Sequence, residues 1–290
     1  MNPQPPAPTC VRHPNRPTGL ACTRCGRPSC AECLRPAAVG QHCVDCLRQD
    51  QRNTPRVRTV AGAPVARSPI PYITYALIVA NVVIYAVTAV QSKSLVDNYY
   101  RSTFFARWML VPDLVADGQW VRVLGAGFLH WGPIHLALNM FALWVVGRSL
   151  EPALGRTRYL AVYLVALLGG SAASMIFQDP TSAAAGASGA VYGLFGAITV
   201  LLIRVRQNPN QMLILIGINI FISFSLPGIS LSGHLGGLIA GTLATLGVLF
   251  LPEWLHAKSQ EAAHSIGWAA IAAVALVDLV AIGAAVASLA

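Results

Sequence analysis

The amino-acid sequence predicts an all-α polytopic membrane protein that is preceded by a small cysteine-rich domain. Hydrophobic residues make up 55% of the 290 residues and charged residues 11%, whereas about a quarter of the residues in soluble domains are charged. Apolar segments of about 20 residues recur along the chain, and each is long enough to cross the hydrocarbon core as a helix. All seven cysteines lie within residues 10–46.

Composition divides the chain into four parts. Residues 1–47 contain the cysteines, 48–70 form a basic linker rich in Pro and Ala, 71–252 contain six apolar segments, and 253–290 contain a loop and a seventh segment. The seven segments lie at residues 72–90, 132–150, 158–177, 186–203, 211–226, 231–251 and 267–289. We therefore expect a six-helix bundle followed by an extra C-terminal transmembrane helix.

The cysteine-rich domain has four pairs of potential metal ligands, and two residues separate the members of each pair. The pairs are Cys10 and His13, Cys22 and Cys25, Cys30 and Cys33, and Cys43 and Cys46. Eight such ligands fill two tetrahedral zinc sites and leave no cysteine over. Disulfides are disfavoured because the cysteine count is odd and because the cytosol keeps thiols reduced. The segment has little apolar content, so zinc binding is expected to supply its folding free energy.

The pairing of these ligands has two alternatives. In cross-braced pairing the first and third pairs hold one ion and the second and fourth pairs hold the other, which resembles a B-box-type zinc finger. Consecutive pairing is the other possibility, and His42 is an alternative ligand to Cys43. Both sites are closed by four protein ligands, so we expect structural and not catalytic zinc. A cytosolic protein is the expected partner of this domain.

The linker at residues 48–70 lacks helical and strand periodicity, which predicts a flexible segment. Its arginines either contact anionic lipid of the inner leaflet or serve only as determinants of topology. They are Arg48, Arg52, Arg56, Arg58 and Arg67.

The basic residues predict how the chain is oriented in the membrane. The net charge is +9, and sixteen of the twenty Lys and Arg residues fall on one side if the spans alternate. By the positive-inside rule this side is cytoplasmic, so we expect the N-terminus inside and the C-terminus outside. Nucleic acid is not expected as a partner, because the finger has few aromatic residues for base stacking. Abundant Ala, Arg and Val and the lack of an organellar targeting segment favour a bacterial plasma membrane.

The segment at residues 91–131 is too polar to span the membrane but rich in aromatic residues, which favour the headgroup level. We expect an external loop that is partly embedded in the interface. The aromatic residues are Tyr99, Tyr100, Phe104, Phe105, Trp108, Trp120 and Trp131.

Two residues inside the apolar segments have catalytic potential. Ser188 begins the fourth segment and His234 begins the sixth, and both segments start outside in the predicted topology. The external end of the second segment carries His130, His135 and Asn139. This convergence predicts a hydrolytic site near the outer leaflet. The structural alternative is that Ser188 merely belongs to a close helix contact, because small residues surround it.

The expected chemistry is nucleophilic acyl transfer, with His234 as the general base for Ser188. No third acid is evident, since Asp278 lies in the seventh segment and Glu151 at the internal end of the second; we therefore expect a dyad. His135 and Asn139 share one helix face. They are expected to donate hydrogen bonds to an oxyanion together with the Ser188 backbone N–H, although an interhelical hydrogen bond is an alternative role.

Small residues predict close contact between the fourth and sixth segments. Gly237 and Gly241 form one such face, and Gly189, Gly193 and Gly196 form the other. In the seventh segment, we expect Asp278 to order the extra helix against the bundle rather than to take part in catalysis.

With these motifs, residues 72–251 closely resemble the rhomboid family of intramembrane serine proteases. The motifs are Gly118-Gln119-Trp120-Val121-Arg122, His130-x4-His135-x3-Asn139-Met140 with Gly147 and Glu151, Gly186-x-Ser188-Gly189 with Tyr192, and His234-x2-Gly237-x3-Gly241. The loop motif of the family commonly reads Trp-Arg, whereas here Val121 precedes Arg122.

The resemblance implies roles for individual residues. Ser188 and His234 would form the catalytic dyad, His135 and Asn139 would contribute to the oxyanion hole, and Tyr192 would pack on His234. Gly186, Gly189, Gly237 and Gly241 would support the site. The implied function is an intramembrane serine endopeptidase that cleaves transmembrane proteins near the external membrane face without a catalytic cofactor. The alternative is a non-catalytic membrane adaptor that binds transmembrane clients and uses its zinc domain to recruit a cytosolic partner.

Overall fold

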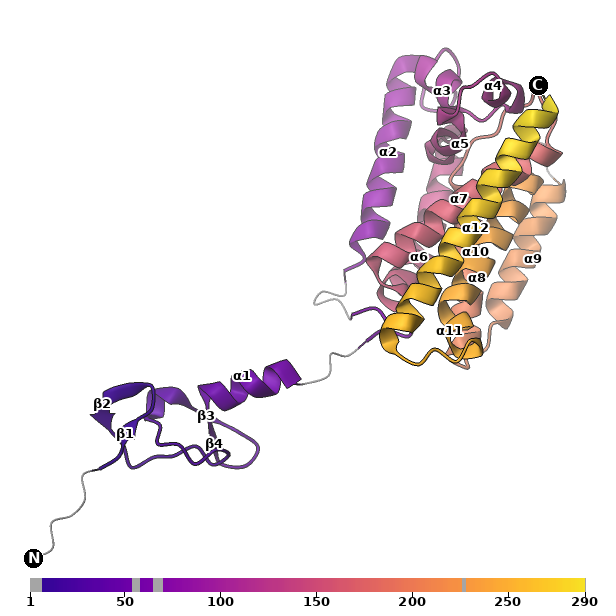
Figure 1. Cartoon of the computed structure of the whole chain (residues 1–290). Coiled ribbons are helices and arrows are strands. Elements are labelled where there is room, and N and C mark those ends of the chain that lie inside the picture. Colours follow the sequence, from indigo (N-terminus) through magenta and orange to yellow (C-terminus); the bar gives the residue numbers. More distant parts are fainter. Residues whose placement is uncertain (1–6, 54–57, 65–69, 226–227, 290) are drawn as a thin grey trace, which may run out of the picture. The chain divides into compact units, whose positions relative to one another are not determined.

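The computed structural model describes residues 7–53, 58–64, 70–225 and 228–289. The chain forms two compact units that divide after Val57, and Figure 1 gives the elements of each. The bundle of long helices belongs to the second unit.

The N-terminal unit is built from two short hairpins and one helix. Strand β1 (Thr9–Cys10) pairs antiparallel with β2 (His13–Pro17), and β3 (Leu34–Pro36) pairs antiparallel with β4 (Gln41–Cys43). A 3₁₀ helix, η1 (Ala31–Cys33), precedes β3, and α1 (Val44–Asn53) follows β4. The buried residues of its two clusters are six cysteines and Leu34. The unit therefore has almost no apolar core, as the composition predicted.

Helix α1 corrects the prediction of an irregular linker. It continues to Asn53, six residues into the segment that was expected to lack secondary structure. Asp45 lies in its first turn and Arg52 in its last, and these charges suit the helix dipole. An ion pair between Arg24 and Asp50 ties the middle of the helix to the preceding loop. Arg56 and Arg67 of the linker lie outside the described residues.

Helices occupy the positions of all seven predicted apolar segments. They are α2 (Tyr72–Ser92), α6 (Gly132–Leu154), α7 (Arg156–Phe177), α8 (Ser188–Arg204), α9 (Asn210–Ser225), α10 (Leu231–Leu249) and α12 (Gln260–Leu289). Among the described residues, α2, α7, α10 and α12 are long and apolar enough to cross a membrane. A fifth candidate combines residues 121–128 with α6 at a bend of 88°, while α8 and α9 are shorter apolar helices. The second unit is thus a multi-pass membrane bundle.

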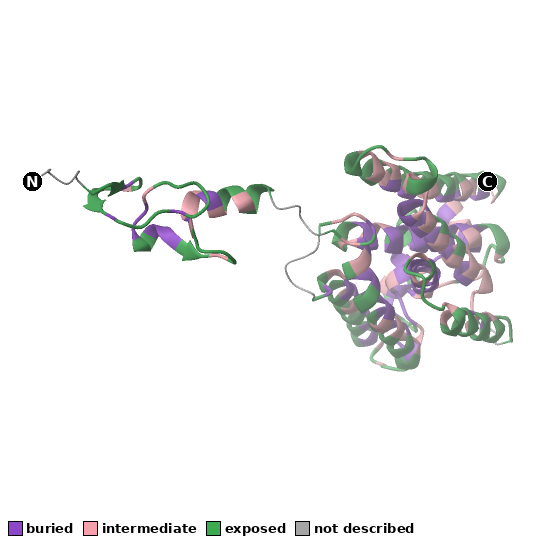
Figure 2. Cartoon of the chain, turned by 90° about the horizontal axis from the view of Figure 1, so that it is seen from below, coloured by how far each residue is buried: buried purple, intermediate pink, exposed green. Residues whose placement is uncertain are grey.

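Helix α8 lies at the centre of the bundle, and α9 lies at its edge. Every residue of α8 from Ala190 to Leu201 is buried, because α6, α7 and α10 pack around it. In α9 only Ile216 and Ser223 are buried. Figure 2 shows the same contrast, with buried residues concentrated where the inner helices meet.

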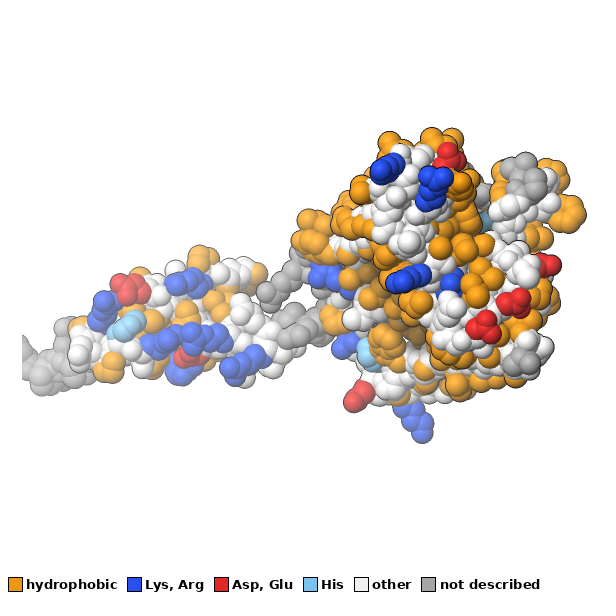
Figure 3. Space-filling model, turned by 90° about the horizontal axis from the view of Figure 1, so that it is seen from above, with side chains coloured by type: hydrophobic (Ala, Val, Ile, Leu, Met, Phe, Trp, Pro, Cys, Tyr) orange, Lys and Arg blue, Asp and Glu red, His pale blue; other side chains and the backbone are white. Residues whose placement is uncertain are grey.

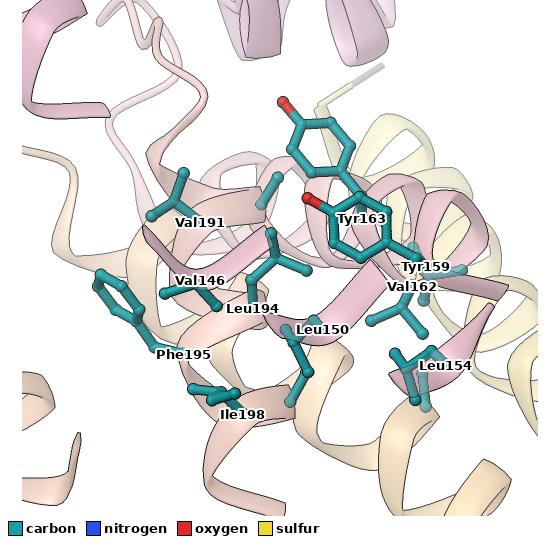
Figure 4. Packing of buried hydrophobic residues seen from close by; sticks show 14 of the residues in the cluster. Val146, Leu150, Leu154, Tyr159, Val162, Tyr163, Val191, Leu194, Phe195 and Ile198 are labelled. Carbon is teal, nitrogen blue, oxygen red and sulfur yellow. The ribbon is translucent and has the colours of Figure 1, made fainter. Parts of the chain in front are cut away.

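The main core joins α6, α7 and α8. Figure 4 shows Leu194 of α8 between Val146 and Leu150 of α6, with Tyr159 and Val162 of α7 on the far side of Leu150 in the same cluster. Outward-facing hydrophobic residues cover much of the bundle surface (Figure 3). Examples are Leu138, Phe141, Phe224, Leu276 and Val280, each more than half exposed. A bundle that is apolar both inside and outside suits a lipid environment.

The loop between α2 and α6 contains short helices that its composition did not reveal. They are α3 (Thr103–Trp108), α4 (Pro112–Ala116), α5 (Val121–Gly125) and the 3₁₀ helix η2 (Ala126–Phe128). Arg122 is buried at their centre. Its Nη1 donates to the carbonyl oxygens of Ala106 and Met109 at 2.8 and 2.7 Å, and its Nε and Nη2 donate to Gln119. The buried Arg122 side chain therefore holds the segments of this loop together.

At the other end of the bundle, Glu151 of α6 binds the start of α2. Its carboxylate accepts the backbone N–H groups of Ile73 and Thr74 at 3.0 and 2.8 Å, and the Thr74 hydroxyl at 2.9 Å. The first N–H groups of a helix lack intrahelical partners, so Glu151 supplies the cap that Pro71 does not.

Arg158 of α7 joins three distant parts of the second unit. Its side chain is buried, and its guanidinium donates to the carbonyl oxygens of Ala61 and His264. Ala61 lies in the turn between Arg58 and Pro64, which form an isolated antiparallel bridge. Arg158 therefore holds this turn and the start of α12 against the bundle.

Helix α11 (Leu251–Trp254) leads to α12, which packs along α7 and α10. Near its middle, Asp278 is buried beside Gly169 of α7. Its Oδ2 atom has no hydrogen-bond partner within the part of the chain that the structure describes.

Candidate active site

Ser188 is the first residue of α8, and backbone hydrogen bonds fix the segment that leads to it. Leu110 and Ala184 exchange two such bonds of 2.9 Å, and the N–H of Gly186 donates to Ala126 at 2.9 Å. Both partners belong to the loop between α2 and α6. The position of Ser188 is therefore set by this loop as well as by its own helix.

His234 lies in the first turn of α10, 46 residues beyond Ser188. Ser230 caps this helix by accepting the N–H of Gly233. The Nε2 atom of His234 lies 2.7 Å from Ser188 Oγ, and the imidazole is buried. The structure thus brings together the two residues for which the sequence predicted a proton transfer.

Glycines allow the helices that carry these residues to touch through their backbones. A Cβ atom at Gly237 would overlap the carbonyl oxygen of Gly189, and one at Gly241 would lie 2.5 Å from the Cα of Gly193. Real Cβ atoms are not found at such distances. A third contact, between Gly196 and Thr242, extends the same seam. The predicted small-residue faces of α8 and α10 therefore lie against each other, which is the packing expected of close membrane helices.

Tyr192 lies one turn after Ser188 and stacks on the imidazole of His234. The ring centroids are 4.1 Å apart and the planes differ by 13°. This contact is the one that the family resemblance implied for Tyr192.

Ser223 of α9 is a polar contact of His234 that the sequence did not reveal. Its Oγ lies 2.8 Å from His234 Nδ1 and 3.1 Å from the hydroxyl of Tyr192. In the sequence, Ser223 is one of several polar residues, with Asn219 and Ser225, that interrupt an apolar segment. Helical spacing alone did not single it out, because the helix shows most of its surface to the outside.

His135 approaches Ser188 from α6. The backbone N–H of Trp131 donates to His135 Nδ1 at 3.2 Å, which leaves the proton of the neutral ring on Nε2. A Cβ atom at Gly186 would lie 3.0 Å from this Nε2 and 3.3 Å from Ser188 Oγ. The ring therefore faces the same small space as the serine.

Asn139 and His130 are oriented differently from His135. One N–H of the Asn139 amide donates to the carbonyl of His135 at 3.0 Å. The ring of His130 is buried against that of His135, with centroids 5.1 Å apart, and neither of its nitrogens has a hydrogen-bond partner among the described residues. Its carbonyl accepts from Asn98, so His130 packs behind the site.

A cavity of about 50 Å³ adjoins Ser188 and His234. Ser171, Ser174 and Ser230 are among the residues that line it. A single water needs about 10–15 Å³ of such space, so the cavity has room for water next to the serine.

The N-terminal unit contains two clusters that could each hold a metal ion. One consists of Cys10, His13, Cys30 and Cys33, and the other consists of Cys22, Cys25, Cys43 and Cys46. The sets follow the cross-braced pairing, not the consecutive one. All seven cysteines are free, which argues against the disulfide alternative.

The spacing of the ligand atoms fits zinc. With Zn–S bonds of about 2.3 Å, the sulfurs of a tetrahedral site lie about 3.8 Å apart. The Sγ atoms of Cys25 and Cys43 are 3.8 Å apart, and His13 Nδ1 lies 3.4 Å from the sulfurs of Cys30 and Cys33. Cys43, not His42, belongs to the second cluster.

Two thiols of the first cluster have contrasting acidity. A backbone hydrogen bond at Cys30 lowers the pKa of the Cys10 thiol to about 6, which favours the thiolate that binds metal. Burial raises the pKa of the Cys33 thiol to about 11. Metal binding at this cluster therefore has to release a proton from Cys33.

Taken together, the fold and this site define a multi-pass membrane protein with a serine–histidine pair among its helices. Residues 117–251 match the family model of the Rhomboid domain. The chain is 40% identical over 146 residues to rhomboid protease GluP of Bacillus subtilis, a match that covers 49% of this chain and 28% of the relative. It is 33% identical over 134 residues to the rhomboid protein YdcA of the same species, covering 44% and 67%. The chain belongs to the rhomboid family.

Other relatives extend the range of the comparison. Rhomboid protease AarA of Providencia stuartii is 27% identical over 212 residues, which cover 63% of this chain and 75% of the relative. RHOMBOID-like protein 5 of Arabidopsis thaliana is 33% identical over 149 residues, or 49% and 48%. The chain spans less than half the length of GluP and of the Arabidopsis protein. The matched domain does not include the N-terminal unit.

Proposed function

We propose that this protein is an intramembrane serine endopeptidase that cleaves transmembrane proteins near the external membrane face. The observation that carries the proposal is the 2.7 Å contact between His234 Nε2 and Ser188 Oγ at one end of an apolar bundle. Hydroxyl and imidazole at this distance meet the geometric requirement for a general base and its nucleophile. Relatives that are named rhomboid proteases support the same activity.

In the proposed reaction, His234 takes the proton of the Ser188 hydroxyl while Oγ attacks the scissile carbonyl carbon. Collapse of the tetrahedral intermediate breaks the C–N bond, and His234 returns the proton to the leaving amine. Water then attacks the acyl-enzyme through the same base. The cavity beside the dyad is suited to hold this water.

The oxyanion of the intermediate would be stabilised by donors from two helices. Ser188 is the first residue of α8, so its N–H has no intrahelical partner and lies at the positive end of the helix dipole. His135 Nε2–H and the second N–H of the Asn139 amide are the other proposed donors. Loss of one such donor typically costs roughly 2.7–4 kcal/mol of transition-state stabilisation.

The zinc domain is proposed to serve as a cytosolic attachment that recruits a partner protein. The ligand sets support two structural zinc ions, each of which would stabilise the fold of this unit. We retain the predicted orientation, with the N-terminus inside and the C-terminus outside, and a bacterial plasma membrane. Membrane lipid would contact the outward-facing hydrophobic surface.

Cleavage of a panel of model transmembrane substrates in liposomes tests the proposal. The wild-type chain is compared with Ser188→Ala and His234→Ala, and thermal unfolding confirms that each variant is folded. Loss of cleavage in both folded variants is the expected result. A wild type that binds these substrates but cleaves none, with binding unchanged in Ser188→Ala, would instead favour the membrane adaptor.

A further inference from the structure

The side chain of Ser223 is positioned to control the protonation of His234 from outside the dyad. It is one of two buried residues on α9, and it faces the imidazole on the side opposite to Ser188. Its Oγ lies within hydrogen-bond distance of three groups: the carbonyl of Asn219 at 2.7 Å, His234 Nδ1 at 2.8 Å and the Tyr192 hydroxyl at 3.1 Å.

The number of protons on a hydroxyl determines the direction of these bonds. A serine has a single O–H donor and two acceptor lone pairs. The carbonyl of Asn219 only accepts, so Ser223 donates its proton there. Its oxygen must then accept from both other groups, which places a proton on His234 Nδ1. The Tyr192 hydroxyl is the second donor.

A proton on Nδ1 leaves Nε2 of the neutral imidazole as an acceptor. Nε2 is the atom that lies 2.7 Å from Ser188 Oγ, and only an unprotonated Nε2 can take the serine proton. Orientation of the ring is fixed by the same contacts, since Tyr192 stacks on one face and also donates to Ser223. In serine hydrolases that have a triad, a carboxylate performs this orienting role. Here the group at His234 Nδ1 is the hydroxyl of Ser223, whereas the carboxylate of Asp278 is buried beside Gly169 of α7.

We propose that Ser223 is a positioning residue that selects the Nδ1–H tautomer of His234 and orients its ring, so that a hydroxyl on α9 takes the place of a triad acid. This inference rests on the proposed protease function for its kinetic consequences. The tautomer itself does not depend on activity and is measured separately.

The test uses the full-length chain in liposomes and three variants. Ser223→Ala removes the hydroxyl, Ser223→Thr keeps an Oγ that can still bond to the carbonyl four residues earlier, and Ser225→Ala removes an exposed serine from the same helix as a control. We expect Ser223→Ala to lower kcat for a cleaved transmembrane substrate by about tenfold, a typical contribution of one hydrogen bond to a charged group. KM should stay within about twofold, since no substrate contact is removed. Ser223→Thr should restore most of the rate, and Ser225→Ala should match wild type.

Two further measurements separate positioning from a general loss of structure. The rate at which a fluorophosphonate labels Ser188 should fall with kcat in Ser223→Ala, while thermal unfolding should show that the variant is still folded at the assay temperature. Solid-state ¹⁵N NMR of histidine-labelled protein, assigned with His234→Ala, should show a protonated Nδ1 in wild type and a mixture of tautomers in Ser223→Ala.

The outcomes are distinguishable from failure of the proposed function. A wild type that neither cleaves nor is labelled contradicts the protease, whereas the NMR spectrum still decides the role of Ser223. The inference is overturned if His234 carries its proton on Nε2 in wild type. It is also overturned if the folded Ser223→Ala variant retains the wild-type kcat, or if Ser223→Thr is as slow as Ser223→Ala.

Discussion

Gly186 lies next to both His135 and Ser188, and its lack of a side chain allows these two residues to lie close together. Its backbone has a φ of +147°, which residues with a side chain rarely adopt. A Cβ atom there would lie 2.8 Å from His135 Cε1 and 3.3 Å from Ser188 Oγ. The space that this glycine leaves open is the space that a substrate carbonyl would need.

Gly186→Ala is therefore expected to reduce cleavage and fluorophosphonate labelling by more than about tenfold, since an ångström-scale displacement of reacting groups has effects of this size. Gly118→Ala is the matched control. It also changes a glycine with positive φ, at +90°, but has nothing within 4 Å of the added Cβ. Equal losses in the two variants would mean that backbone strain, and not crowding of His135 and Ser188, is responsible.

Individual residues differ in how far the sequence could place them. His234 was identifiable because histidine is rare in the apolar segments, and Ser188 because the predicted topology places it on the same side as His234 and because its motif resembles that of the rhomboid family. Ser223 was not, since a serine on a lipid-exposed helix is common and only the rotation of α9 in the bundle turns it toward His234. The position of Asn139, with one N–H turned to the carbonyl of His135, also depends on side-chain conformation rather than on pattern.

At the scale of elements, the seam between α8 and α10 depends on glycine at each contact. Gly241→Ala should destabilise the bundle by about 1–3 kcal/mol, the usual cost of an overpacked interior, because the added carbon meets the backbone of Gly193. At Gly283 on α12 an added Cβ has nothing within 4 Å, so Gly283→Ala should not lower stability, since alanine is favoured over glycine in a helix by about 0.5–1 kcal/mol. Thermal unfolding in detergent compares the two; equal melting temperatures would contradict the close packing.

The cap on α2 gives a second expectation at this scale. Glu151→Gln replaces one acceptor oxygen by an N–H₂ group that faces the N–H groups of Ile73 and Thr74. Buried donors without acceptors cost about 1–3 kcal/mol, so the melting temperature should fall. Glu253→Gln, which removes an exposed ion pair with Arg204, should change stability by less than about 0.5 kcal/mol. A smaller effect at Glu151 than at Glu253 would argue against the capping role.

Hydropathy located the long helices because a membrane span needs a continuous apolar run, and such runs are rare by chance. It did not locate α3, α4 and α5, since helices of five or six residues have too few turns to show a period. It also missed α1, where the helix carries mostly polar residues and is stabilised by its terminal charges and by the ion pair of Asp50.

For the whole molecule, the two units depend on different sources of stability. The N-terminal unit has clusters of cysteines where an apolar core would lie, whereas the membrane unit has a large hydrophobic core. Removal of zinc with a chelator is therefore expected to unfold the first unit and leave the second folded. Limited proteolysis should then cleave within residues 7–53 while fluorophosphonate labelling of Ser188 persists. Resistance of the N-terminal unit to protease after zinc removal would contradict this.

The ligand sets predict the zinc content of the chain. Wild type should bind two ions, and Cys43→Ser should bind one, because Cys43 belongs to the second cluster only. His42→Ala should keep two, since His42 lies outside both clusters. Elemental analysis of purified protein distinguishes the cases. One ion in His42→Ala would instead assign that histidine as a ligand.

The two hydrogen bonds of Arg158 can form only at different stages of protein synthesis. Its two backbone acceptors, at Ala61 and His264, are about two hundred residues apart in the chain, so one leaves the ribosome long before the other. In a nascent chain that ends before residue 264, the guanidinium of Arg158, in the first turn of α7, lacks its hydrogen bond to the carbonyl of His264. The last helix is thus more than an addition to a finished bundle. Its synthesis supplies the second acceptor of Arg158, whose first acceptor, Ala61, lies near the start of the membrane unit. A chain truncated before α12 would lack this second hydrogen bond.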